Sequence, residues 1–241
     1  MTLVASFSVF AELVKAPQTI KKEKGSIAVT EKGKSRWTAD WTMEPLTVDG
    51  RAAVRFTEKG RGLYSPYKTE VQWTVEAIWK ADGHYRPLRF ERTFTDSRGK
   101  SLATRRKTFD EAKGVAMVDD KAFTIPPDTI TVEGMGGILR SMPFESSRPF
   151  TTHVLSNEPR LYEASIEPRG RERLKTPAGE FDCYKVEMVP HLGALDVIRK
   201  FLPKTQFWFT VAAPHFWVKY EGFENGVGTP RITMELKTYE R

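Results

Sequence analysis

The chain is 241 residues long, and 39% hydrophobic with 12% aromatic residues is enough for a sizeable core, which excludes an intrinsically disordered protein. Its net charge of +7 suits an anionic partner, but 38 basic residues interspersed with 31 acidic ones are more typical of solvated strand faces. One cysteine, Cys183, excludes an intrachain disulfide, and no apolar run reaches the ~18 residues of a membrane-spanning helix. We expect a single β domain over residues 1–241.

The N-terminal segment has the spacing of a short helix. Its apolar side chains recur at intervals of four, three and four residues, at Leu3, Phe7, Phe10 and Val14. Because Pro17 stops this pattern, we expect a helix over about residues 4–15. No basic residue precedes the apolar run and no convincing cleavage site follows it, so we do not interpret the segment as a signal peptide.

After this segment the hydrophobic period changes to two. In residues 36–43 the apolar positions are Trp37, Ala39, Trp41 and Met43. In residues 70–80 they are Val71, Trp73, Val75, Ala77 and Trp79. A period of two places these side chains on one face of a β-sheet. The dipeptide Asp82-Gly83 then predicts a hairpin turn, after which Leu88, Phe90 and Phe94 continue the pattern.

Short strands with turn signals between them fill most of the remaining chain. We expect them at about 101–109, 115–119, 160–167, 171–176, 181–189, 206–211, 216–221 and 231–239. The turn signals are Lys113-Gly114, Pro168-Arg169-Gly170, Pro177-Ala178-Gly179, Ala213-Pro214 and Asn225-Gly226. Such short connections favour antiparallel meanders over βαβ units. The predicted fold is mainly β with minor α: a large curved antiparallel sheet with two or three short helices covering one face.

Two segments interrupt the strand pattern. Residues 125–150 are rich in Pro and Gly and predict a loop insert with a helical turn in its middle. Residues 194–202 predict a helix that ends at Pro203 and has an apolar face of Leu195, Ile198 and Leu202. An amphipathic helix is the usual cover for the apolar face of a sheet, and incomplete cover leaves a cavity that can bind a ligand.

The aromatic segment 206–220 is the most unusual part of the sequence. One interpretation is that its rings pack in the core on both sides of the sheet. The other is that some of them line an apolar cavity together with rings of the earlier strands and the face of the 194–202 helix. The candidate cavity residues are Trp73, Trp79, Phe90, Phe207, Phe209, Phe216, Leu195 and Ile198.

Two basic stretches are candidates for a charged surface. Their side chains are Arg105 and Lys107 in one strand, and Arg171, Arg173 and Lys175 in another. An exposed row of this kind suits an anionic membrane surface or polysaccharide. Charged residues on the outer face of an edge strand produce the same pattern, and no nucleic-acid motif accompanies them, so nucleic acid is not favoured as a partner.

No motif in the sequence carries a recognisable chemistry. The four histidines, His84, His153, His191 and His215, are too far apart for a local metal pair. Cys183 lies inside a strand pattern without a neighbouring histidine, which favours a buried thiol over a nucleophile. Gly134-Met135-Gly136-Gly137 lacks the lysine of a phosphate-binding loop, so we interpret it as a strand bend or a flexible lid. We therefore predict no catalytic residue, metal or cofactor.

The second half of the chain contains four features in a fixed order: the turn Thr176–Phe181, Trp208 in a strand, the break at Pro214 and the final Glu235-Leu236 strand. In these features the chain resembles a bacterial envelope family that is known only as a domain of unknown function. That family is similar in fold to the lipoprotein carriers LolA and LolB, which implies a half-open barrel with helices at its mouth. It also implies the periplasm or cell envelope and, by analogy, an apolar cavity.

Three functions are compatible with these patterns. The first is a non-enzymatic envelope protein that binds or carries an apolar, lipid-like ligand in a half-barrel cavity. The second is a structural or interaction module whose basic face contacts anionic lipid or polysaccharide. The third is an enzyme whose site is assembled only in the fold, for example around His191 and His215. The sequence indicates neither the ligand nor the oligomeric state.

Overall fold

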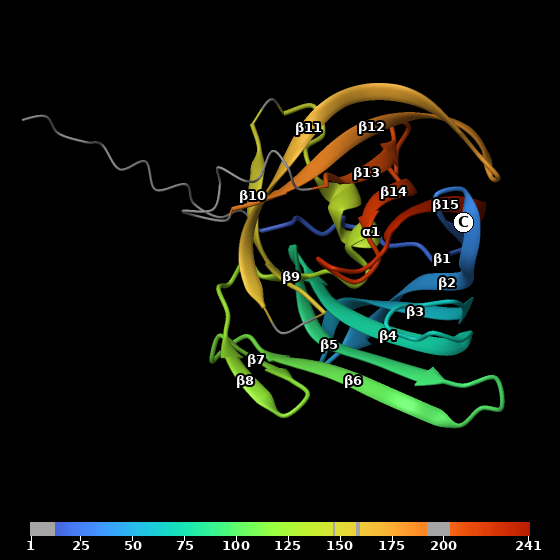
Figure 1. Cartoon of the computed structure of the whole chain (residues 1–241). Helices are drawn as coiled ribbons and strands as arrows, with labels where there is room; N and C mark the ends of the chain where they lie inside the picture. Colours follow the sequence, from blue (N-terminus) through green and yellow to red (C-terminus); the bar gives the residue numbers. More distant parts are fainter. Residues whose placement is uncertain (1–12, 147, 158–159, 192–202) are drawn as a thin grey trace, which may run out of the picture.

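Period-two sequence patterns become long strands of one strongly curved sheet (Figure 1). The structure is a computed structural model that describes residues 13–146, 148–157, 160–191 and 203–241. Its first strands are β1 (Glu23–Glu31), β2 (Lys34–Val48), β3 (Arg51–Gly62), β4 (Val71–Asp82), β5 (His84–Thr95), β6 (Ser101–Asp110), β7 (Val115–Val118) and β8 (Lys121–Thr124). Then follow β9 (Ile130–Thr131), α1 (Met135–Ile138), the 3₁₀-helix η1 (Leu139–Ser141) and β10 (Phe150–Leu155). The last strands are β11 (Leu161–Thr176), β12 (Gly179–Pro190), β13 (Thr205–Thr210), β14 (Trp217–Phe223) and β15 (Arg231–Glu240).

The strands form two meanders that are joined in the middle of the sheet, where the first strand of the chain pairs with the last. The order across the sheet is β8-β7-β6-β5-β4-β3-β2-β1-β15-β14-β13-β12-β11-β10-β9. All neighbours are antiparallel except β9 and β10, which are parallel. β1 pairs with β15, with Lys24 opposite Glu240. The predicted large curved antiparallel sheet is therefore confirmed.

The sheet curls until its two ends pack against each other without forming a continuous ladder. Lys107 on β6 donates hydrogen bonds to Glu133, just after β9, and to the carbonyl oxygen of Ser156, just after β10. A small apolar cluster around Ala116, Val118 and Leu155 lies at the same junction. Since side-chain contacts join the two ends, the shape is a half-open barrel, as predicted.

The concave face holds the main core, which is dominated by aromatic rings. Trp37 and Trp73 meet edge to face with ring centroids 5.2 Å apart, and Tyr64 packs on Trp73 at 5.0 Å. Such pairs stabilise a core by ~0.5–1.5 kcal/mol beyond the burial of their area. A smaller cluster around Cys183, Trp208 and Val218 covers the convex face of β12–β14.

A short helical plug lies inside the curve of the sheet (Figure 1). It consists of α1 and η1 with the residues around them, 132–144, and buries Ile138, Leu139 and Phe144. Gly134 begins α1 with φ 66°, and a Cβ atom at this position would lie 2.1 Å from Cη2 of Trp79. Glycine is needed here because the plug runs directly against the sheet. Gly134–Gly137, which we interpreted as a bend or lid, is thus part of the interior.

Several predicted elements differ from the structure. The two strands predicted on either side of Pro168-Arg169-Gly170 are one strand, β11, because Gly170, at φ 93°, takes up a bulge instead of a turn. Strands β1, β3, β8, β9 and β10 were not predicted. In β3, alternation fails because the inward positions after Phe56 are Glu58 and Gly60.

The predicted helices fall mostly on parts of the chain outside the described residues. This holds for residues 192–202, and for 4–12 of the N-terminal prediction. Leu13–Lys15 are not helical; Lys15 forms an isolated bridge with His84. The predicted loop insert, 125–150, contains β9, α1 and η1.

Candidate ligand-binding cavity

A large cavity lies between the concave face of the sheet and the plug. Its volume is about 1230 Å³. One wall comes from β1–β5, the opposite wall from β11–β15, and the plug forms a third through Gly134–Gly137 and Arg140. This volume exceeds the ~300–1,000 Å³ typical of sites for drug-sized ligands.

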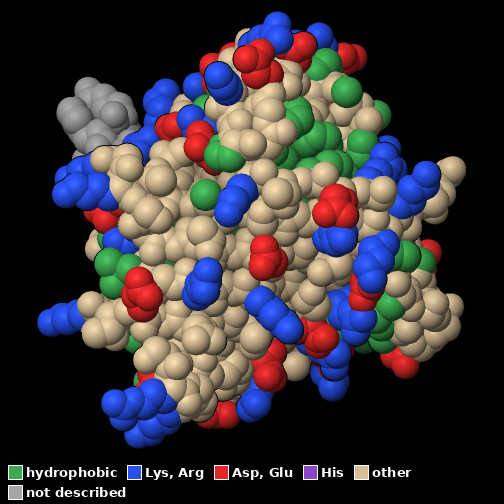
Figure 2. Space-filling view, turned by 90° about the vertical axis from the view of Figure 1, so that its right-hand side faces the viewer, with side chains coloured by type: hydrophobic (Ala, Val, Ile, Leu, Met, Phe, Trp, Pro, Cys, Tyr) green, Lys and Arg blue, Asp and Glu red, His purple; other side chains and the backbone are tan. Residues whose placement is uncertain are grey.

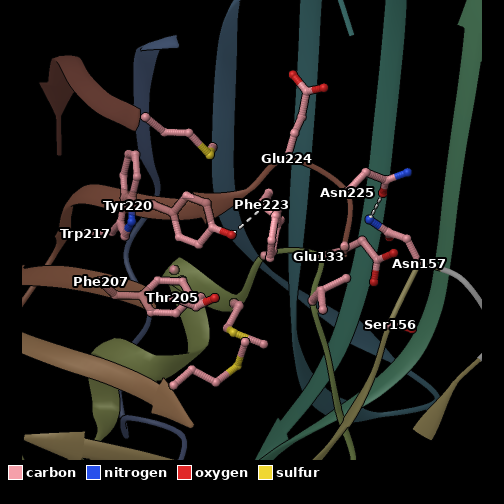
Figure 3. Close-up of a pocket in the computed structure, with 18 of the residues that line it drawn as sticks. Glu133, Ser156, Asn157, Thr205, Phe207, Trp217, Tyr220, Phe223, Glu224 and Asn225 are labelled. Atoms are coloured by element: carbon pink, nitrogen blue, oxygen red, sulfur yellow. Dashed lines mark hydrogen bonds between the residues drawn. The ribbon is translucent and has the colours of Figure 1, made fainter. Parts of the chain in front are cut away.

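The wall from β13 and β14 is aromatic (Figure 3). Phe207 packs on Tyr220 with ring centroids 5.0 Å apart, and Trp217 lies against the plug. The hydroxyl of Tyr220 donates a hydrogen bond of 2.8 Å to the carbonyl oxygen of Phe223, so the ring is held in place. A Cβ atom on Gly136 would lie 3.1 Å from the Trp217 ring, which explains glycine at this point of the plug. These side chains give the cavity a rigid apolar wall.

The opposite wall carries a cross-strand row in which polar and apolar side chains alternate. Trp41 on β2 is opposite Glu58 on β3, Glu58 is opposite Val75 on β4, and Val75 is opposite Arg92 on β5. All four residues line the cavity. The Trp73 indole donates to the Glu58 carboxylate at 2.7 Å, and burial raises the pKa of Glu58 although Arg92 and Trp73 oppose this. The row therefore brings two ionisable groups into a mainly apolar space.

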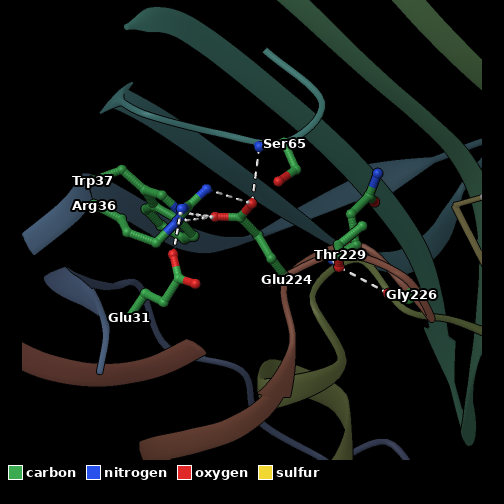
Figure 4. Close-up of polar contacts among 8 residues, drawn as sticks. Glu31, Arg36, Trp37, Ser65, Glu224, Gly226 and Thr229 are labelled. Atoms are coloured by element: carbon green, nitrogen blue, oxygen red, sulfur yellow. Dashed lines mark hydrogen bonds and ion pairs between the residues drawn. The ribbon is translucent and has the colours of Figure 1, made fainter. Parts of the chain in front are cut away.

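A buried carboxylate fixes the loop between β14 and β15 across the sheet (Figure 4). Glu224 lines the cavity, and its side chain is fully buried. Its oxygens accept hydrogen bonds from Nε and Nη2 of Arg36 at 3.1 Å each, from Nε1 of Trp37 at 2.7 Å and from the amide of Ser65 at 2.8 Å. These donors compensate the negative charge of the Glu224 carboxylate. Nearby, Asn157 donates to Asn225 and joins this loop to the one after β10 (Figure 3).

The structure divides the predicted cavity residues into two groups. Phe207 and Phe216 line the cavity. The other four described rings lie in the core and outside the cavity wall: Trp73, Trp79, Phe90 and Phe209. Trp73 and Trp79 are held there by close contacts with Gly60 and Gly134. Leu195 and Ile198 lie outside the described residues.

The predicted basic surface is corrected at one position. Arg105, Arg171, Arg173 and Lys175 are exposed, but Lys107 is buried, with its ammonium 2.7 Å from Glu133. The reason is its register: Lys107 is opposite Phe90, so it points to the concave face, where Glu133 supplies the counter-charge.

The exposed basic side chains have acidic neighbours. Arg105 pairs with Asp119, Arg171 with Glu145 and Arg173 with Glu180. Figure 2 shows Lys and Arg side chains mixed with Asp and Glu over the face that it displays. Since the charges are compensated locally, no continuous basic patch forms on these strands.

Three of the four histidines make local polar contacts outside the cavity. His153 Nδ1 lies 2.8 Å from Asp128, and His215 Nδ1 lies 2.9 Å from the carbonyl oxygen of Thr210. His191 lies between Ser165, at 2.7 Å, and Glu163, at 3.1 Å. This order of acid, imidazole and hydroxyl resembles a hydrolase triad, but Ser165 is buried and these residues do not line the cavity.

Two further observations bear on chemistry. Burial raises the pKa of the Cys183 thiol to about 12, and the residue is fully buried, so it is no nucleophile at neutral pH. Within the described ranges, no three His, Cys, Asp or Glu side chains are placed to hold a metal ion. No described helix is long and apolar enough to cross a membrane.

The fold and the cavity together define a class: a single curved antiparallel sheet that encloses a large, mainly apolar cavity around a short helical plug. The chain belongs to the family described as protein of unknown function (DUF3108), whose model matches residues 25–237. This confirms the resemblance to a family of unknown function, whereas the likeness to LolA and LolB stays a prediction. No curated protein sequence is significantly similar to this chain.

Several solved structures are similar to the chain, among them the following two. One is a protein of Bacteroides fragilis, predicted to be exported and described as having a YmcC-like fold, with 14% identity and a TM-score of 0.35. The other is a predicted lipoprotein of Parabacteroides distasonis, with 11% identity and a TM-score of 0.34. Each match covers 95% of this chain and 100% of the other.

Proposed function

We propose that this protein binds an apolar, lipid-like ligand in the cavity of its half-barrel and performs no catalysis there. The observation that carries the proposal is the cavity itself: about 1230 Å³ bounded by side chains such as Phe207, Trp217 and Met234. Transfer of an alkyl chain from water into such a space is favourable by ~0.8 kcal/mol for each buried CH₂ group.

The rigidity of the walls supports binding over a role in packing alone. Trp217 is fixed by the plug and Tyr220 by its hydrogen bond to Phe223, so the aromatic wall is formed before a ligand arrives. A preformed site loses little conformational entropy on binding. The resemblance of the Thr176–Phe181 turn and the closing strands to an envelope family supports a place in the cell envelope, where such ligands occur.

The test is to fill the cavity from one wall. Met234 on β15 lines the cavity and is half-buried, so Met234→Trp adds a ring to the open space. We expect this variant to bind an alkyl-chain fluorophore about tenfold more weakly, which corresponds to ~1.4 kcal/mol. Native mass spectrometry of the purified wild type is expected to show co-purified lipid that M234W lacks.

The matched control is Leu102→Trp, because Leu102 is exposed and lies outside the cavity wall. It should bind the fluorophore like the wild type. Equal binding by M234W and the wild type, with both folded, would contradict the proposal.

A further inference from the structure

Most charges on the cavity wall are neutralised by the protein itself. Lys107 and Glu133 form a buried pair at 2.7 Å. Arg140 donates two hydrogen bonds to Glu23, at 2.5 and 3.1 Å. Glu224 takes its counter-charge from Arg36. These pairs follow the rule that buried charges are matched.

Arg92 is different. Its hydrogen bond is from Nη1 to the hydroxyl of Tyr64, at 3.0 Å, and its Nε has no partner. Among the described residues no carboxylate lies within ion-pair distance of its guanidinium. Instead the rings of Tyr64, Phe90 and Phe94 surround it, with centroids 5.6, 5.4 and 5.9 Å from Cζ. An arginine stays charged in a protein, and this one interacts with the Glu58 and Glu133 carboxylates only at a distance, without an ion pair to any described residue.

The nearest acidic groups are already engaged. Glu58, across Val75, accepts the indole hydrogen bond of Trp73, and its burial favours the neutral acid. Glu133 accepts the Lys107 hydrogen bond through Oε1, and its Oε2 has no hydrogen-bond partner among the described residues. Neither carboxylate forms the fork of two hydrogen bonds that a guanidinium offers to an anion.

Tyr64 adds a second donor at the same place. Its hydroxyl oxygen accepts from Arg92, and none of its hydrogen bonds to described residues uses its own hydrogen. Tyr64 and Arg92 both line the cavity. Both side chains therefore offer hydrogen-bond donors, an arrangement that suits a ligand group that only accepts hydrogen bonds.

We propose that the ligand is an amphiphile with one anionic head, a carboxylate or phosphate, bound by Arg92 and Tyr64. Its alkyl chain lies along the apolar side chains of the cavity, among them Trp41, Met43 and Phe56 of the neighbouring strands. This inference rests on the proposed function and adds the chemistry of the head. Arginine is well suited to this role, because its planar fork matches carboxylate and phosphate oxygens.

The experiment compares ligands that share one chain and differ in the head. Palmitate, methyl palmitate and hexadecyl phosphate compete with an alkyl-chain fluorophore for the purified full chain. We expect palmitate to bind about tenfold more tightly than the ester in the wild type. In Arg92→Met the ester should bind as before, and the preference for the acid should disappear. If hexadecyl phosphate binds like palmitate, the site accepts a phosphate head as well as a carboxylate. If palmitate alone of these two binds, the site takes a carboxylate head. Either result supports the anionic head.

The control is Arg89→Met, on the same strand, because Arg89 is exposed, pairs with Glu76 and does not line the cavity. It should keep the preference for the acid. If R92M does not fold, Tyr64→Phe and Arg92→Lys replace it, and each should reduce the preference several-fold. Equal binding of acid and ester by the wild type, or an unchanged preference in these variants, overturns the inference and leaves the cavity proposal intact. If no ligand binds, the proposed function itself fails.

Discussion

At the scale of single residues, the inward-facing charges are the features that sequence patterns conceal. Arg92 shares the period-two phase of Phe90 and Phe94, and Glu58 shares that of Val54 and Phe56. A charged residue in the phase of two buried rings was therefore a signal available in the sequence. This signal alone does not predict the site, because only the register of the strands shows that Glu58 and Arg92 belong to one cross-strand row.

Glu224 leads to the first stability prediction. Glu224→Gln removes the negative charge that faces Arg36, while it keeps an oxygen for Trp37 or Ser65. We expect the free energy of unfolding to fall by about 2 kcal/mol, because a charge-assisted network in a buried site is broken. Urea unfolding followed by tryptophan fluorescence measures this.

The control for this variant is Glu240→Gln, since Glu240 pairs with Lys24 on the surface. It should unfold like the wild type, because exposed ion pairs contribute little. A midpoint for E224Q equal to that of E240Q would show that the Glu224 network does not stabilise the fold.

At the scale of elements, strands were predictable where every inward position is apolar. β4 satisfies this from Val71 to Trp79, and its hairpin to β5 follows at Asp82-Gly83. β3 was not predicted, because its inward position 60 is a glycine and breaks the apolar alternation. Glycine is needed there to leave room for the Trp73 ring of the next strand. For the plug, the sequence predicts a helical turn within residues 125–150 but not its place inside the sheet: its four-residue helix has no periodicity, and its glycines are explained by rings that are distant in sequence.

The plug leads to the second stability prediction. Gly134→Ala places a methyl group 2.1 Å from the Trp79 ring and forces alanine to φ 66°. We expect a loss of about 3 kcal/mol, the sum of overpacking and of left-handed backbone strain. Thermal or urea unfolding of the purified variant tests this.

Gly33→Ala separates the two causes, because Gly33 has φ 78° but no atom within 4 Å of an added Cβ. This variant should lose only the strain contribution, on the order of 1 kcal/mol. If G134A and G33A lose equal stability, the plug does not press on the sheet as described.

At the scale of the whole molecule, the junction between the two ends of the sheet contains one buried ion pair beside its apolar cluster. Lys107→Met leaves the Glu133 carboxylate buried without its partner, and we expect a loss of about 3–5 kcal/mol. The double variant K107M/E133Q should regain most of it, because no buried charge then remains unpaired. Hydrogen exchange should show faster opening of β9 and β10 in K107M.

Lys113→Met is the control for this pair, because Lys113 and Asp110 form an exposed ion pair one turn further along the chain. It should change neither the stability nor the exchange of β10. If K107M is as stable as K107M/E133Q, then water, and not Lys107, compensates the charge of the Glu133 carboxylate.

The pairing of β1 with β15 means that the fold is a circular permutation of a simple meander. If the chain were read from β9 through β15 and then from β1 to β8, the order in sequence would equal the order across the sheet. Among the described strands, β1–β15 is the one pairing between elements far apart in sequence, so the rest of the sheet has low contact order. Loop closure over nearly the whole chain is then the slow topological step of folding. A permuted chain that opens between β8 and β9 would not need this step.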